Sequence, residues 1–343
     1  MKSFRLFFSL FLFCSIYAFP VELAMPKEGE GIYRFLRSHG RNPKIYYNTF
    51  VELNKQSLGK DLSLLKGVSY VLPPLSSTNT LALNPVEKHS AVISANKNTL
   101  IEPLFGKNYS EYTVQSNKLS GATFYLVSGH GGPDCGAIGN INGTAIYEVE
   151  YAYDIMLRLA RSLMMEGAKV HIIIQDKQNG IRDDMILKLN RKKTCRGKEI
   201  PRSQLKRLQQ QCDEINTLAN KSKDAYQRAI FIHLDSRSIK QQVDVFFYYN
   251  ETSAAGKRLA NTMRSTFKNQ YQLHQPNRGF TGTISFRNLH VLANTVPVSL
   301  FAELGNIQNS FDQQRFIQSS NRQALANWMC RGFIADYENT KKN

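Results

Sequence analysis

Several patterns that would point to common functions are missing from this 343-residue chain. No two cysteines have the CxxC spacing of a zinc knuckle. Neither a GxGxxG pattern nor a Gly-Lys-Ser/Thr pattern occurs, which argues against a dinucleotide site or a phosphate-cradling loop. Long internal repeats and low-complexity tracts are also absent, while 42% of the residues are hydrophobic. The chain therefore has the composition of an ordinary globular protein, with one large domain or two modest ones.

Acidic residues are scarce relative to basic ones. The chain has 27 Asp and Glu against 44 Lys and Arg, which gives a formal net charge of +17. A charge of this size indicates an anionic partner. Nucleic acid, an anionic membrane surface and an anionic polymer outside the cell are the three candidates.

The amino terminus narrows that choice. The run "MKSFRLFFSLFLFCSIYA" carries Lys2 and Arg5, then an apolar stretch, then the small residue Ala18. This order is typical of a secretory signal peptide, which we assign to residues 1–18, and the apolar stretch is too short for a spanning helix. A buried first helix is the less favoured alternative. An exported chain predicts a periplasmic or secreted location, a cell-wall polymer or membrane as partner, and no nucleic acid.

Four cysteines remain after residue 18, namely Cys135, Cys195, Cys212 and Cys330. In an oxidising compartment Cys195 and Cys212 are the favoured pair, because they flank one basic segment. Four reduced thiols are the alternative, and the sequence leaves both open.

Residues 20–74 predict a small α+β module. The runs "EGEGIYRFLRSHG" and "KIYYNTFVELNKQSLG" have helical periodicity, and "GVSYVLPP" reads as a strand. With Gly29 before the first helix and "ELN" after the second, the module resembles the LysM family, which implies binding of glycans that contain N-acetylglucosamine. The family's usual Gly-Asp-Thr opening reads Gly-Glu-Gly here, and a structural cap without a ligand is the alternative. We interpret residues 75–118, rich in polar residues and proline, as a linker with some local strand, partly packed on its neighbours.

From residue 119 to 337 strand and helix patterns alternate. Repeated units of this kind predict an α/β domain with a mostly parallel, twisted sheet and helices on both faces. The clearest strand is 122–128 and the clearest helix is 148–166. That helix has an apolar stripe, and its charged residues fall on the opposite face. The charged residues are Glu150, Asp154, Arg158 and Arg161.

Candidate catalytic residues follow the predicted strands. His130, His233 and Glu303 each lie at or just past a strand end, where active sites gather in such sheets, and Glu148 opens the long helix. Two imidazoles and one carboxylate are the ligand set of a catalytic zinc with its fourth position left to water. Glycines beside His130 allow the backbone to bend round an ion. Each residue taken alone is also consistent with a structural role.

Four runs in this region occur in a recognisable order, namely "SGHGGPDCGAIG", "YEVEYAYDIMLRLARSLMMEGAKV", "FIHLDS" and "VPVSLFAELGNIQN". Together they resemble the zinc-dependent N-acetylmuramoyl-L-alanine amidases of the Amidase_3 type. The resemblance implies that Zn²⁺ is held by His130, Glu148 and His233, and that Glu303 is the catalytic acid and base. Counting back from the Gly-Ala-Lys-Val end of the second run places the ligand on Glu148 rather than Glu150.

The resemblance implies hydrolysis of the amide between N-acetylmuramic acid and L-alanine of the peptidoglycan stem peptide. Glycan strands and stem peptide are then the partners, and an activator protein is a further candidate. A non-catalytic wall-binding protein and a zinc peptidase acting on the stem peptide are the alternatives. The basic segment 177–202 is longer than a simple connection needs. A solvated loop, a regulatory lid and a contact for an anionic polymer all remain open for it.

Overall fold

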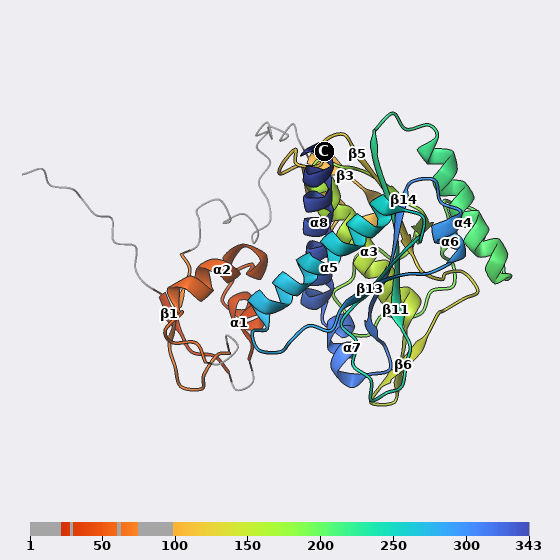
Figure 1. Ribbon diagram of the computed structural model, residues 1–343. Helices are drawn as coiled ribbons and strands as arrows, with labels where there is room; N and C mark the ends of the chain where they lie inside the picture. The colour runs from red at the N-terminus through yellow and green to blue at the C-terminus, as the bar shows by residue number, and fades with distance from the viewer. Residues whose placement is uncertain (1–21, 28–29, 60–62, 75–98, 343) are drawn as a thin grey trace, which may run out of the picture. The chain divides into compact units, whose positions relative to one another are not determined.

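The computed structural model describes residues 22–27, 30–59, 63–74 and 99–342 (Figure 1). The predicted signal peptide, residues 1–18, lies outside the described residues. Residues 75–98 of the predicted linker also lie outside them. The chain divides into two compact units, Met1–Ile93 and Ser94–Asn343. None of the described helices is both long enough and apolar enough to cross a bilayer.

The smaller unit has the two predicted helices and the predicted strand after them, with a further short strand before them. It consists of β1 (Glu22–Ala24), α1 (Ile32–Ser38), α2 (Pro43–Leu53) and β2 (Tyr70–Leu72), and the two strands pair antiparallel. One apolar cluster fills the unit. Its buried members are Ile32, Phe35, Leu36, Tyr46, Phe50, Tyr70 and Leu72.

The larger unit is built on a six-stranded sheet in the order β13-β12-β14-β11-β5-β8. Four of the five neighbouring pairs are parallel and only β12 and β14 run antiparallel, which confirms the predicted mostly parallel α/β sheet. The strands are β5 (Ala122–Ser128), β8 (Lys169–Ile172), β11 (Tyr226–Asp235), β12 (Phe246–Tyr249), β13 (Thr283–Phe286) and β14 (Val298–Asn306).

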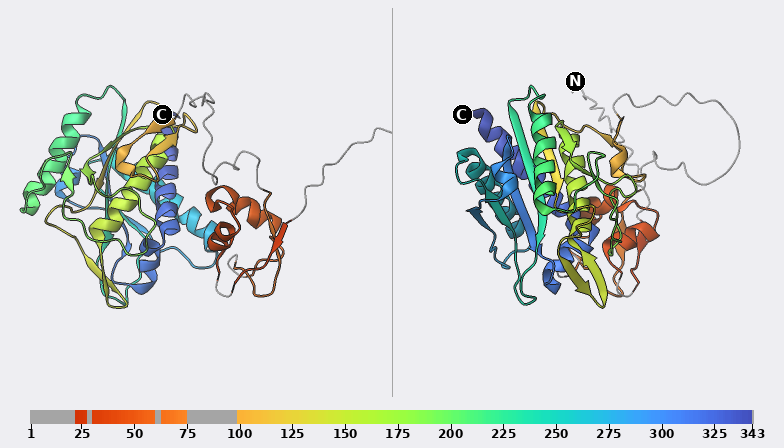
Figure 2. Two further views of the ribbon diagram at one scale, coloured as in Figure 1. Left: turned by 180° about the vertical axis from the view of Figure 1, so that it is seen from behind. Right: turned by 90° about the vertical axis from the view of Figure 1, so that its right-hand side faces the viewer.

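Helices cover both faces of this sheet. On one side lie α3 (Glu148–Met165), α5 (Ala254–His274) and α8 (Ser319–Lys342), and on the other lie α4 (Gln204–Ala219) and α6 (His290–Ala293) (Figure 1). The turned views show α3 beside α8 (Figure 2). The pattern near the C-terminus predicts one helix over 311–335, but α7 (Ser310–Ile317) and α8 are separate helices. The break is Gln318, whose backbone is extended, with φ −82° and ψ 118°.

Short elements complete the larger unit. They are β3 (Thr99–Ile101), the 3-10 turn η2 (Pro103–Phe105), β4 (Glu111–Thr113), the hairpin of β6 (Ile138–Ile141) and β7 (Thr144–Tyr147), and the pair β9 (Ile174–Gln175) and β10 (Thr194–Cys195). The first three lie in the stretch 75–118, which the sequence predicts to be a linker with some local strand. Phe105 is fully buried in the core of the larger unit, and its carbonyl accepts the backbone N–H of Ile181 at 3.0 Å. From residue 99 onward this segment is therefore part of the folded unit.

Two features lie beyond what the sequence pattern decides. The charged face of α3 is buried over most of its length, since Glu150 and Asp154 are 0% exposed and Arg158 is 3% exposed. Of the two alternatives left open for the cysteines, the structure has the reduced one, with four free thiols in the described part of the chain.

Candidate metal centre

The loop after β5 brings His130 to the end of the sheet. His130 has φ 66°, in the left-handed region that few residues other than glycine adopt. Gly129 precedes it, and a Cβ at that position would lie 2.1 Å from Cε1 of His233. Only glycine leaves room for the second imidazole there, so the glycine-rich exit from the strand has a steric reason.

His233 and Glu303 lie side by side because β11 and β14 run parallel, with the two residues as register partners. The ring of Phe301 stacks on the His233 imidazole, with ring centres 4.3 Å apart and planes 15° apart. This contact limits rotation of the imidazole. The antiparallel strand β12 adds Phe246 opposite Glu303.

Glu148 is the first residue of α3 and completes the group. Its Oε2 lies 3.0 Å from Nε2 of His130, and its Oε1 lies 2.9 Å from Nδ1 of His233. The candidate ligand atoms of the three residues all lie within 4.8 Å of one another, the one such group found among the described residues. Glu150 points elsewhere and pairs with Lys193.

The carboxylate of Glu148 is held in its charged form. Burial raises the pKa of this group, but hydrogen bonds from His130 and His233 outweigh burial and bring the pKa below its usual range. Two backbone N–H groups also donate to it, from Ala137 at 2.8 Å and from Leu234 at 3.1 Å. Gly136 is required nearby, since a Cβ there would lie 2.6 Å from Glu148 Oε2.

A second carboxylate orients His130. Asp134 Oδ2 lies 2.9 Å from Nδ1 of His130, which leaves Nε2 facing Glu148. Burial lowers the pKa of His130, but hydrogen bonds to Asp134 and Glu148 outweigh it and raise the pKa to about 10. Arg207 of α4 in turn holds Asp134, with Nη2 at 2.5 Å from Oδ2. Sequence reasoning did not single out Asp134 or Arg207; the only local signal was an acid four residues after the histidine.

The residues present fit a zinc ion. Two ring nitrogens and one carboxylate oxygen converge from rigid elements, and histidine that ligates a metal commonly gives its other N–H to a carboxylate, as His130 does to Asp134. Glu303 adds an acid with a buried oxygen, Oε2, that has no hydrogen-bond partner. Burial, and then the nearby charges of Glu148 and Asp235, raise the pKa of Glu303 well above its ordinary value. The arrangement can hold a divalent ion next to a buried carboxyl group.

Comparisons with known proteins point to amide hydrolysis. Residues 125–335 match the family model Amidase_3, described as N-acetylmuramoyl-L-alanine amidase. A comparison with curated protein sequences gave no match.

Three solved structures with a similar fold are amidases. AmiC2 of Nostoc punctiforme is 20% identical with a TM-score of 0.45, covering 64% of this chain and 99% of that chain. CwlV of Bacillus (Paenibacillus) polymyxa is 19% identical with a TM-score of 0.45, covering 62% and 96%. Ami1 of Mycobacterium abscessus is 16% identical with a TM-score of 0.47, covering 64% and 100%. Because the family model spans well over half of the sequence, the chain belongs to the Amidase_3 family of N-acetylmuramoyl-L-alanine amidases, hydrolases of peptidoglycan.

Proposed function

We propose that this protein is a zinc-dependent amidase that cleaves the bond between the lactyl group of N-acetylmuramic acid and L-alanine of the stem peptide. His130, Glu148 and His233 hold Zn²⁺, and Glu303 is the catalytic acid and base. One observation carries the proposal. The three donor groups converge within 4.8 Å, with a buried, unpartnered carboxyl oxygen of Glu303 on the strand next to His233.

An amide resists hydrolysis because its carbonyl is weakly electrophilic and its amine leaves poorly. Zinc, when bound, supplies the Lewis acidity that activates water and polarises the carbonyl. Glu303 takes a proton from the attacking water and gives a proton to the departing nitrogen, which yields a muramic acid carboxylate and a free stem-peptide amine. Its raised pKa suits the second of these steps, because the carboxyl group then holds its proton until the nitrogen takes it.

The remaining parts of the proposal concern delivery to the wall. Residues 1–18 direct export to a periplasmic or secreted, wall-associated location. The LysM-like unit, residues 20–74, retains glycan near the site and raises the effective substrate concentration. The positive charge of the chain favours an anionic wall. An activator protein is a further candidate partner.

Digestion of purified peptidoglycan tests the function. Wild-type protein is compared with Glu303→Gln, with a chelator-treated sample and with the matched control Glu338→Gln, an exposed residue of α8. We expect wild type and Glu338→Gln to release stem peptides that begin with free L-alanine, while the other two samples release none. Shortened peptides would point instead to a peptidase, and the absence of any cleavage to a wall-binding protein.

A further inference from the structure

Some cations of the basic segment 177–202 form ion pairs with residues that the structure describes, and others do not. It contains nine Lys and Arg residues and three acids. Arg182 and Lys193 are ion-paired with Glu150, and Arg196 and Lys198 are ion-paired with Glu214. The other five cations have no ion pair within the described part of the chain, and three of those five line one cavity. The three are Arg191, Lys192 and Arg202.

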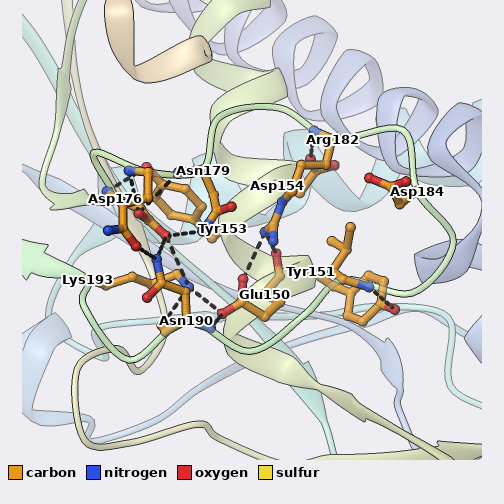
Figure 3. A network of polar contacts seen from close by, with 12 residues as sticks. Glu150, Tyr151, Tyr153, Asp154, Asp176, Asn179, Arg182, Asp184, Asn190 and Lys193 are labelled. Atoms are coloured by element: carbon orange, nitrogen blue, oxygen red, sulfur yellow. Dashed lines mark hydrogen bonds and ion pairs between the residues drawn. The ribbon is translucent and has the colours of Figure 1, made fainter. Parts of the chain in front are cut away.

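The segment is fixed to α3 by a buried polar network (Figure 3). Lys193 Nζ lies 2.5 Å from Glu150 Oε1, and both side chains are 0% exposed. The same oxygen accepts the backbone N–H of Asn190 at 2.8 Å, while Glu150 Oε2 lies 2.9 Å from Nη2 of Arg182. Arg191 and Lys192 thus sit between two anchored neighbours, Asn190 and Lys193. Their backbone is held in place, which excludes a freely solvated loop at this point.

Asp176 provides a second attachment. Its Oδ2 accepts from the side-chain amide of Asn190 at 2.7 Å and lies 3.8 Å from Lys193 Nζ. Its backbone N–H donates to the hydroxyl of Tyr153 on α3 at 2.8 Å, and the ammonium of Lys193 lies 5.3 Å from the centre of the Tyr153 ring. Both ends of the stretch from 176 to 193 are therefore tied to the same helix that carries Glu148.

The cavity beside this stretch is large enough for a peptide side chain or terminus. Its volume is about 440 Å³, and it is lined by Gly132, Pro133, the run from Arg191 to Thr194, Gly197, Glu199, Ile200 and Arg202. Glu199 is the one acid among these residues, against three cations without an ion pair. Such a lining favours an anionic ligand, since clustered guanidinium and ammonium groups are the usual partners of carboxylates.

The cavity is next to the metal centre. Gly132 follows His130 by two residues, so their Cα atoms are at most about 7 Å apart. Ile200 packs against the same loop so closely that a Cβ at Gly132 would lie 2.9 Å from the Cβ of Ile200. Arg191, which lines the cavity, also donates from Nη1 to the carbonyl of Pro133 in that loop at 2.9 Å. The cavity is therefore only about two extended residues away from a substrate bound at the metal centre.

We propose that the cavity binds a free carboxylate of the stem peptide, held by Arg191, Lys192 and Arg202, and so places the scissile amide at the metal centre. The inference rests on the proposed amidase function. The described lining residues include cations and no aromatic ring, so the cavity suits a peptide carboxylate better than a sugar ring of the glycan. A contact with a separate anionic wall polymer is the competing occupant, and the experiment distinguishes the two.

The experiment uses the full chain with two soluble probes. One is an N-acetylmuramoyl tripeptide with free carboxylates, and the other is the same compound with every peptide carboxylate converted to a carboxamide. Arg191→Gln, Lys192→Gln and Arg202→Gln are combined in one variant. The matched control removes three exposed cations of α5, as Lys257→Gln, Arg258→Gln and Lys268→Gln.

We expect the cavity variant to raise KM for the free-carboxylate probe by on the order of tenfold or more, with kcat and zinc content little changed, because charge-assisted bonds to a carboxylate are lost. The amidated probe should bind wild type and the cavity variant equally weakly, and the control should behave as wild type. Equal KM values for wild type and the cavity variant on the free-carboxylate probe would overturn the inference, as would a loss seen only with whole peptidoglycan sacculi.

Binding of the two probes, measured by calorimetry, separates this inference from the function. If wild type binds the free-carboxylate probe more tightly than the amidated one and cleaves neither, the amidase proposal fails and the cavity proposal stands. If wild type cleaves both probes with the same KM, the amidase proposal stands and the cavity proposal fails.

Discussion

Two glutamates of α3, Glu148 and Glu150, show how one helix builds two different regions. Both are buried, and they are two residues apart, so they point to sides of the helix that differ by about 200°. Glu148 faces two imidazoles, whereas Glu150 faces Lys193 and Arg182. Imidazoles can give up their protons and bind a metal, but the partners of Glu150 are an ammonium and a guanidinium, which donate hydrogen bonds and offer a metal no lone pair. The same residue type therefore serves chemistry on one side and structure on the other.

The largest effect is expected at Glu148. In Glu148→Ala the metal should be lost, and activity should fall by more than the roughly 10²–10⁴-fold that acid–base catalysis alone supplies, since the site then lacks its metal as well. Zinc content and peptidoglycan hydrolysis are the measurements. Thermal stability in chelator should fall less than in Glu150→Ala, because both imidazoles can become neutral, although the backbone N–H groups of Ala137 and Leu234 lose their acceptor. A collapse of stability in this variant would remove the contrast with Glu150.

Glu150→Ala should act on folding. It leaves the buried Lys193 and the partly buried Arg182 without the Glu150 carboxylate, which costs about 3–5 kcal/mol in the free energy of unfolding. That corresponds to a midpoint lower by roughly 6–20 °C for a unit of this size. Urea unfolding measures it. Glu150→Met with Lys193→Met should recover much of the loss, and a change below about 1 kcal/mol in the single variant would contradict the account.

Asp134→Asn should have an intermediate effect. The carboxamide holds the His130 ring less firmly and leaves Arg207 without its charged partner, so zinc affinity should fall by about 10–100-fold. Competition with a chromophoric chelator measures this affinity. Activity should return at high zinc concentration. Unchanged affinity would mean that Asp134 does not orient the ligand.

The smallest effect is expected at Lys198, whose side chain is 68% exposed and pairs with Glu214. Lys198→Gln should leave the free energy of unfolding nearly unchanged, because water screens exposed ion pairs. The same urea titration checks this value. A loss as large as that of Glu150→Ala would show that burial is not what separates the two ion pairs.

Much of the larger unit could be predicted from local pattern. The strands that hold His130, His233 and Glu303 are apolar runs with clear ends, and α3 begins at Glu148, as the count back from Gly167 requires. The order of the sheet and the antiparallel β12 depend on contacts between distant residues, which periodicity does not report.

What the sequence does not report has physical causes as well. Periodicity groups Glu150 and Asp154 on one charged face, but it does not report that both are buried, where cations brought by distant parts of the chain compensate them. Arg322, in α8, reaches Asp154 Oδ2 at 2.6 Å across 168 residues of sequence. The break at Gln318 lacks a proline or glycine to mark it.

The most direct test is to measure zinc per chain together with the zinc ligands by X-ray absorption spectroscopy, in wild type, Glu148→Ala and Glu150→Gln below their unfolding temperatures. The account predicts one zinc per folded chain with two imidazole nitrogens and carboxylate oxygen in wild type and in Glu150→Gln, and no stoichiometric zinc in Glu148→Ala. Zinc retained by Glu148→Ala with the same ligand signature, or absent from active wild-type protein, would contradict it.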